Sequence, residues 1–174
     1  MKIWRWNING IFCALALASL LCGCKTAEQK KEAKQQTILK VHLEKARDDK
    51  PDQADVPVYR AHPTTIHIDT KEILNNMDIL GASVVDVQGG WGIRIAFDMH
   101  GKHVLENITA MNAGKHLVIY AAFPEVRWLA APLITRRMGN GELIFTADAT
   151  REEADKIVLG INNVAKKIAK GRWP

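Results

Sequence analysis

The chain has 174 residues, of which 47% are hydrophobic and 25% are charged, a composition typical of one packed globular domain with extra segments. Its net charge of +5 includes Lys2 and Arg5, which lie in a segment that we expect to be removed, so the remaining excess does not indicate nucleic acid binding. All three cysteines lie in the first 24 residues, which excludes an internal disulfide, a thiolate metal site and a cysteine nucleophile from the rest of the chain.

The amino terminus has the features of a bacterial lipoprotein signal peptide. Residues 1–9 carry two basic residues and no acidic one, and residues 10–21 form an apolar run shorter than the roughly 20 residues of a membrane span. The run ends in a Leu-Cys-Gly-Cys sequence that resembles the lipobox, and the small Gly23 makes Cys24 the better acceptor. The resemblance implies cleavage after residues 1–23 and lipidation of Cys24. An ordinary signal peptide with incidental cysteines is the alternative.

The residues around Cys24 also predict a location. Acyl chains on Cys24 would hold the protein on a membrane, since each buried methylene contributes about 0.8 kcal/mol. Lys25 stands where an aspartate often retains lipoproteins in the inner membrane, which favours the outer membrane, facing the periplasm. Residues 24–36 would be the lipidated cysteine and a polar tether that reaches on the order of 20 Å as a coil. The folded domain would span residues 37–174.

The first part of the domain is predicted to be mostly extended chain. Alternating apolar residues predict a strand at 37–45, a polar loop follows, and shorter extended pieces are expected at 56–60 and 65–69. A proline in or beside each piece places these pieces at a sheet edge or in irregular structure. Asp69 is expected to cap a short helix with three buried residues, Ile73, Leu74 and Met77.

A β-hairpin is predicted next, because Gly89 and Gly90 lie between two apolar segments, 82–88 and 92–98. The inward side chains of this hairpin would be those of Val85, Val87, Ile93, Ile95 and Phe97. The glycines join two strands and open no helix, so they do not fit a phosphate-binding loop.

A helix, a strand and a second hairpin are expected to follow. The helix, 100–112, would bury Leu105, Ile108 and Met111 and end at Gly114. The nearly continuous apolar run at 115–123 indicates a central strand, and 126–133 contributes a further extended piece. Residues 134–138 and 142–146 would pair with each other across a glycine turn.

The last predicted element, a helix from Thr150 to about Ala169, has the clearest pattern in the chain. Thr150 is a suitable N-cap, and Glu153 completes a capping box with it. Apolar residues recur at helical spacing and make one stripe: Ala154, Ile157, Val158, Ile161, Ala165 and Ile168. We expect this stripe to cover the preceding strands.

The order of residues from Ala82 onward resembles the head subdomain of the large periplasmic domain of SecD, the accessory subunit of the protein-export translocase. The resemblance rests on Phe97, Gly101, Leu105, Ile108-Thr109, Asn112 and Gly114-Lys115, followed by Val126, Ala131-Pro132, Ile134, Gly141, Ile144, Thr146 and the segment from Thr150 to Ala154. It implies an α+β fold of the ferredoxin-like SecD-head type, with a mixed or antiparallel sheet and two main helices on one face. It also implies a surface for unfolded or secreted polypeptide.

The chain departs from the SecD pattern in two turns and in its membrane part. Phe123-Pro124-Glu125 stands where SecD has an aspartate-glycine turn, and Ala147 replaces a glycine. SecD couples export to proton flow through charged residues in its membrane helices, and this sequence shows no such segments. We therefore do not expect a motor function.

Contact residues are predicted among the tryptophans and arginines, because these types are enriched at interaction hot spots. The candidates are Trp91, Trp128 and Trp173 and the pair Arg136 and Arg137. The alternatives are that Trp128 covers the core and that the two arginines are simply solvated.

Catalytic and metal sites are not predicted. His100 and His103 have a spacing that could share a metal, but the sequence signals no third ligand, and zinc needs three or four. Ser83 lacks the glycine elbow of a hydrolase nucleophile. We therefore expect neither an enzyme nor a cofactor.

Three functional hypotheses follow. The first is a lipid-anchored periplasmic binding or scaffold module, associated with protein export or envelope assembly, whose partner is an envelope protein or an exported polypeptide. Binding by strand addition to the pieces at 56–68 is one mode open to it. The second is a structural or small-ligand-binding domain that self-associates through an exposed sheet. The third is an envelope hydrolase with an unrecognised site.

Overall fold

The computed structural model describes residues 31–32, 34–48 and 51–171. Contacts divide the chain into two units, Met1–Lys31 and Glu32–Pro174, and the fold below is that of the second unit. The predicted signal peptide, Cys24, most of the tether and Trp173 lie outside the described residues.

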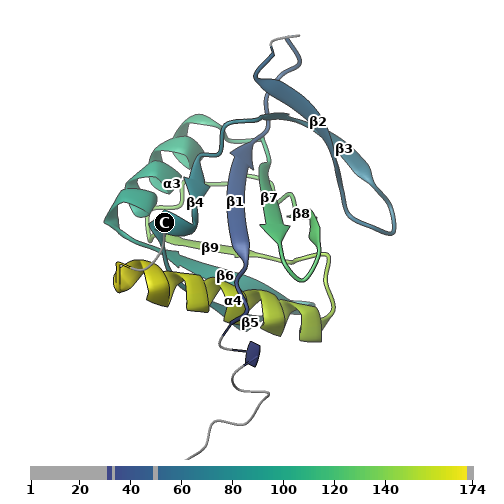
Figure 1. Cartoon of the computed structure of the whole chain (residues 1–174). Helices are drawn as coiled ribbons and strands as arrows, with labels where there is room; N and C mark the ends of the chain where they lie inside the picture. The colour runs from purple at the N-terminus through teal and green to yellow at the C-terminus, as the bar shows by residue number, and fades with distance from the viewer. Residues whose placement is uncertain (1–30, 33, 49–50, 172–174) are drawn as a thin grey trace, which may run out of the picture. The chain divides into compact units, whose positions relative to one another are not determined.

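The second unit is an α+β domain whose strands all pair antiparallel (Figure 1). Its elements are β1 (Ile38–Leu43), β2 (Gln53–Val58), β3 (Thr64–Asp69), β4 (Leu74–Asn75), the 3-10 turn η2 (Asn76–Asp78), β5 (Ile79–Val87), β6 (Gly90–Phe97), α3 (Met99–Met111), β7 (Leu117–Ala122), β8 (Val126–Ala130), β9 (Glu142–Phe145) and α4 (Arg151–Ala169). The strands form a four-stranded sheet in the order β4-β1-β7-β8, a β2-β3 hairpin and a three-stranded sheet in the order β5-β6-β9. The expected fold class is confirmed.

One hydrophobic core joins the two larger sheets to both helices. Alternate residues of β1, Leu39, Val41 and Leu43, point into this core, as their spacing predicts. α4 contacts β5, β6 and β1, whereas α3 contacts β4 and β6. In Figure 1, α4 lies across the lower front of the domain and α3 at its left side. The hairpin of β2 and β3 lies at the upper right.

The α4 prediction is confirmed for the capping box and for most of the apolar stripe. Glu153 N donates to Thr150 Oγ1 over 3.2 Å, and Thr150 N donates to Glu153 Oε2 over 3.0 Å, which completes the capping box. Four stripe residues are buried, Ala154, Ile157, Ile161 and Ala165. Gly160 and Val164 are buried as well, which the stripe did not include.

The prediction of a short helix after Asp69 is wrong. Asp69 Oδ1 does accept a bond from Lys71 N, but this bond closes a tight turn. Leu74 then pairs with Val41 as part of β4, and Ile73 N donates to Val41 O, so the backbone hydrogen bonds go to β1 and not into a helix. Met77, expected to be buried, is 56% exposed.

The first hairpin is confirmed, but its inward face was assigned one residue out of register on β5. Ala82 pairs with Ile95 and Val84 with Ile93, and residues opposite each other in an antiparallel pair share a face. Ala82 and Val84 therefore face the core, not Val85 and Val87. The inward residues expected on β6 are correct.

The prediction of a second hairpin is wrong, because β9 pairs with β6 instead of with residues 134–138. The backbone of Ile134 bonds to the turn after α3, with Ile134 N donating to Lys115 O over 2.8 Å. Met138 N donates to the Thr109 hydroxyl over 2.9 Å, so the segment of residues 134–138 is bound to α3 and not to β9. Met111, expected to be buried on α3, is exposed.

Candidate binding groove

A groove lies between the β2-β3 hairpin and the outer face of the four-stranded sheet. Its volume is about 270 Å³. Strands β1, β7 and β8 form the floor, and the hairpin with the residue after it forms the roof. The lining residues are Lys40, His42, Tyr120 and Trp128 from the floor and Ala54, Val56, Ile68 and Thr70 from the roof.

Strand alternation and register create the floor. Since Leu39 and Val41 point into the main core, Lys40 points to the opposite face of β1. The register places Lys40 opposite Tyr120 and Tyr120 opposite Trp128, so these three side chains form one row across the sheet.

A second apolar row follows on the same face of the sheet. Ile38 pairs with Ala122 and Ala122 with Val126, two residues along from the first row. Ile38 is 42% exposed and Val126 is 71% exposed. The rows lie about 7 Å apart, so the apolar floor extends beyond the groove by the length of two extended residues.

The hairpin is fixed over the floor by a small core of its own. Its inward side chains pack against Val118 of β7, Ala131 after β8 and Trp128, and they come from Val56, Val58, Ile66 and Ile68. The alternation of these residues along both strands leaves polar side chains on the outer surface. The roof is therefore a packed apolar layer.

Trp128 is the centre of the groove. The centroid of its ring lies 5.3 Å from that of the His42 ring, with an angle of 72° between the ring planes. The corresponding values for the Tyr120 ring are 5.2 Å and 63°. Such edge-on contacts are favourable because the positive edge of one ring meets the negative face of the other. Trp128 thus packs against the hairpin core and also lines the groove.

The polar groups of the groove leave it without net charge. His42 Nδ1 donates to the Asp69 carbonyl over 2.9 Å, so Nε2 of the neutral ring is an acceptor. Lys40 Nζ lies 3.3 Å from Glu72 Oε2. Burial raises the pKa of Glu72, but its own backbone N–H and Lys40 lower it more, and the pKa falls below its ordinary value. Glu72 therefore stays ionised beside Lys40.

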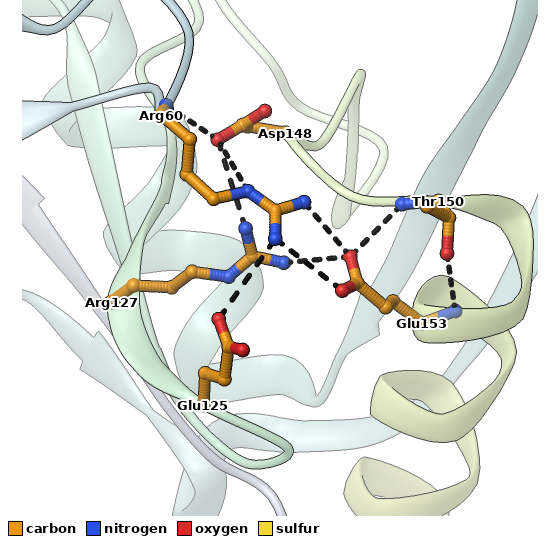
Figure 2. Close-up of polar contacts among 6 residues, drawn as sticks. All are labelled: Arg60, Glu125, Arg127, Asp148, Thr150 and Glu153. Atoms are coloured by element: carbon orange, nitrogen blue, oxygen red, sulfur yellow. Dashed lines mark hydrogen bonds and ion pairs between the residues drawn. The ribbon is translucent and has the colours of Figure 1, made fainter.

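The tip of the hairpin is held by a cluster of ionic contacts (Figure 2). Arg60, between β2 and β3, donates its backbone N–H to Asp148 Oδ2 over 2.7 Å, and its Nη2 lies 3.1 Å from Glu153 Oε2. Arg127 of β8, 11% exposed in its side chain, donates Nη2 to the same Glu153 oxygen over 3.0 Å. Glu125 lies 3.9 Å from Arg60 Nη1. We call these five residues the tip cluster.

The base of the hairpin is tied to the end of β1. Lys45 N donates to His67 O over 2.9 Å, and Lys45 Nζ lies 2.8 Å from Asp69 Oδ2. The Lys45 ammonium lowers the pKa of Asp69. With its tip bound near α4 and its base bound to β1, the hairpin spans the outer face of the sheet as a strap.

The other predicted contact residues lie elsewhere. Trp91 packs against the main core. Arg136 and Arg137 are exposed and line an open pocket of about 350 Å³ with Glu142 and Ile144. Arg137 also forms an ion pair with Glu106. Trp128 is thus the one predicted candidate that the described residues bring into the groove.

His100 has a partner that the sequence did not indicate. Its Nδ1 lies 2.8 Å from Asp78 Oδ1, and one ligand atom each of Asp78, Asp98 and His100 lie within 4.8 Å of one another. Both carboxylates already have structural roles. Asp78 Oδ2 accepts from Asn75 N, and Asp98 Oδ1 caps α3 by accepting from Gly101 N.

Sequence reasoning missed His42, Lys40 and Tyr120. Their signal was the alternation itself, which places His42 and Lys40 on the face of β1 away from the core. That signal does not distinguish a solvated face from a roofed one.

The α+β domain matches a described family. The family model for the SecDF P1 head subdomain matches residues 53–165, more than half of the sequence, and the chain belongs to this family.

Solved structures of SecDF have the same fold. One, of the membrane component SecDF that enhances protein export, superposes with a TM-score of 0.56 at 19% identity over 82% of this chain and 71% of that chain. A crystal structure of SecDF in its super-membrane-facing form gives the same TM-score and identity over 81% of this chain and 21% of that chain. Among curated proteins, no sequence matches. None of the helices in the described residues combines the length and apolarity needed to cross a membrane.

Proposed function

We propose that this protein is a lipid-anchored periplasmic module without enzymatic activity that binds segments of exported polypeptide in the groove. The observation that carries the proposal is the aromatic row of the floor, roofed by aliphatic residues and without net charge. The P1 head family, and the likeness in fold to a component that enhances protein export, support the export context.

The groove fits a chain segment better than an enzyme substrate. Its volume lies below the roughly 300–1,000 Å³ of most small-molecule sites. Among the described residues no carboxylate lines the groove, and the His42 Nδ1 is hydrogen-bonded to the Asp69 backbone carbonyl instead of a carboxylate, so the two do not form a catalytic acid–base pair. A tryptophan in an apolar recess is instead a typical hot spot for protein binding.

A peptide-binding measurement tests this proposal. The full chain, held in lipid nanodiscs, is titrated with a labelled, uncharged peptide rich in leucine and phenylalanine, and empty nanodiscs serve as the blank. Trp128→Ala should weaken binding by about 10-fold or more, as truncation of a hot spot does. Arg136→Ala, in the separate pocket, should leave binding unchanged. Undiminished binding to Trp128→Ala would overturn the assignment of the groove.

The lipid anchor is tested separately. Cys24→Ala should remove acyl-chain labelling and release the protein from the membrane fraction, because the chain would no longer carry covalently bound acyl groups to bury in the bilayer. Cys22→Ala, two residues earlier, should leave labelling intact. Retention of label in Cys24→Ala would refute lipidation at this residue. Separation of inner from outer membranes by density then tests the outer membrane location favoured by Lys25.

A further inference from the structure

We infer that the groove recognises the main chain of an extended polypeptide segment, through Trp128 Nε1, the Tyr120 hydroxyl and His42 Nε2. The inference rests on the proposed function and deepens it. It specifies the substrate class as uncharged, extended segments whose order of side chains matters little.

The three atoms are free to bind. Within residues 31–32, 34–48 and 51–171, none of them has a hydrogen-bond partner. Side-chain polar atoms that are both buried and without a hydrogen-bond partner in these residues are Gln35 Oε1, Thr37 Oγ1 and Arg127 Nη1. The groove atoms are not among these, so each keeps some solvent-accessible surface, and the residues that carry them line the groove, with His42 as a whole 5% exposed.

Their hydrogen-bonding roles complement a peptide group. Trp128 Nε1–H can only donate, so it suits a carbonyl oxygen. His42 Nε2 accepts, because Nδ1 already donates to Asp69 O, so it suits an amide N–H. The Tyr120 hydroxyl can do both. An extended chain presents N–H and C=O groups on the same edge, so one edge can meet donor and acceptor together.

The remaining lining explains what kind of side chains the segment carries. Ala54, Val56 and Ile68 offer an apolar roof without polar groups to read a particular side chain. Lys40 is the lining residue with a permanent charge, and Glu72 neutralises it. Complementarity in charge therefore favours an uncharged segment, since burying an unpaired charge is costly.

Main-chain recognition by strand addition is a poorer fit to this domain. Pro57 in β2 has no N–H to offer at the hairpin. The backbone of Ala82 in β5 is bound by Asn162, and Leu129 O of β8 accepts from Asp148 N. These edges are partly occupied, whereas the groove atoms are open.

The test uses the full chain in nanodiscs and three forms of the uncharged leucine- and phenylalanine-rich peptide: the original, the same residues in reverse order, and the original with alternate amide nitrogens methylated. The reversed peptide should bind within about 2-fold of the original. The methylated peptide should bind about 3- to 10-fold more weakly, the range for loss of one hydrogen bond.

Two conservative variants locate the effect. Trp128→Phe and Tyr120→Phe keep a ring but remove the N–H and the hydroxyl, respectively. Each should weaken binding of the original peptide by about 3- to 10-fold. Neither should alter the melting temperature by more than a few degrees. If the original peptide binds but methylation and both variants change nothing, or if reversal abolishes binding, the inference is refuted while the proposed function stands. If no form binds, both are refuted.

Discussion

Asn162 of α4 binds the backbone of Ala82 in β5 as a neighbouring strand would. Ala82 N donates to Asn162 Oδ1 over 2.8 Å, and Asn162 Nδ2 donates to Ala82 O over 2.9 Å. β5 is an edge strand of its sheet, so both backbone groups would otherwise lack a strand partner. One amide side chain thereby fixes α4 to the sheet and blocks this edge against pairing with another chain.

Replacing this amide should destabilise the domain. Asn162→Leu leaves the N–H and C=O of Ala82 unpaired. We therefore expect the free energy of unfolding, measured in urea, to fall by about 1–3 kcal/mol. Lys166→Ala, at an exposed position of the same helix, should stay within about 0.5 kcal/mol of the parent. Equal stability of Asn162→Leu and the parent would show that the two bonds contribute nothing.

A second contact of α4 predicts an unusual response to alanine. A Cβ at Gly160 would lie 2.8 Å from the backbone N of Thr37 and 3.0 Å from its Cβ. Replacing a glycine by alanine normally stabilises a helix by about 1 kcal/mol. At residue 160, however, the backbone at Thr37 or that of α4 would have to move to make room for the added Cβ. Gly160→Ala should therefore lower the free energy of unfolding by about 1–3 kcal/mol in urea. Asp155→Ala, exposed on α4, is the control, and a gain in stability for Gly160→Ala would contradict the close approach.

These two contacts illustrate what the sequence could not predict. The stripe and capping box of α4 depend on residues a few positions apart, and the capping box and four of the six stripe residues were predicted correctly. The contacts of Asn162 and Gly160 join residues about 80 and 120 positions distant, and nothing local indicates them. The same reason explains the wrong partner for β9, because a short strand with a glycine turn before it fits several pairings.

The groove was predictable only in part. Trp128 was identified because tryptophan is frequent at interaction sites, not because of its position. The floor combines strands β1, β7 and β8, and its row exists only through their register. The capping pattern at Asp69 misled for a related reason: a short polar side chain can close a turn as readily as it begins a helix.

Acid should weaken the domain through its ionic contacts. The Thr150 N–H, and then Arg60 and Arg127, lower the pKa of Glu153 below 4.5, and Lys45 lowers that of Asp69 below 3.8. A carboxyl group with a lowered pKa in the folded state adds stability above its unfolded pKa and loses it as pH falls through the folded value. The melting temperature should thus be level from pH 7 to about 5 and fall below about pH 4.5.

The contribution of Glu153 can be separated from the rest. Glu153→Gln should lower the melting temperature at pH 7 and make the decline below pH 4.5 shallower, since one titrating group is removed. Glu152→Gln, an exposed neighbour in the same turn, should leave the shape of the profile unchanged. A profile for Glu153→Gln parallel to that of the parent would contradict the assignment.

The tip cluster should affect the local stability of the hairpin more than that of the body of the domain. Arg60→Ala removes the guanidinium contacts to Glu153, Asp148 and Glu125 but keeps the backbone bond from residue 60 to Asp148. The hairpin has its own small core, so we expect amide exchange in β2 and β3 to accelerate several-fold while β7 is unchanged. Arg47→Ala is a matched control, because Arg47 pairs with Asp55 on the hairpin and, within the described residues, forms no ion pair with the body. Its exchange rates at the tip should equal those of the parent. If Arg60→Ala instead accelerates β7 and β2 equally, the hairpin and the body open as one cooperative unit, and the strap is not a separable element.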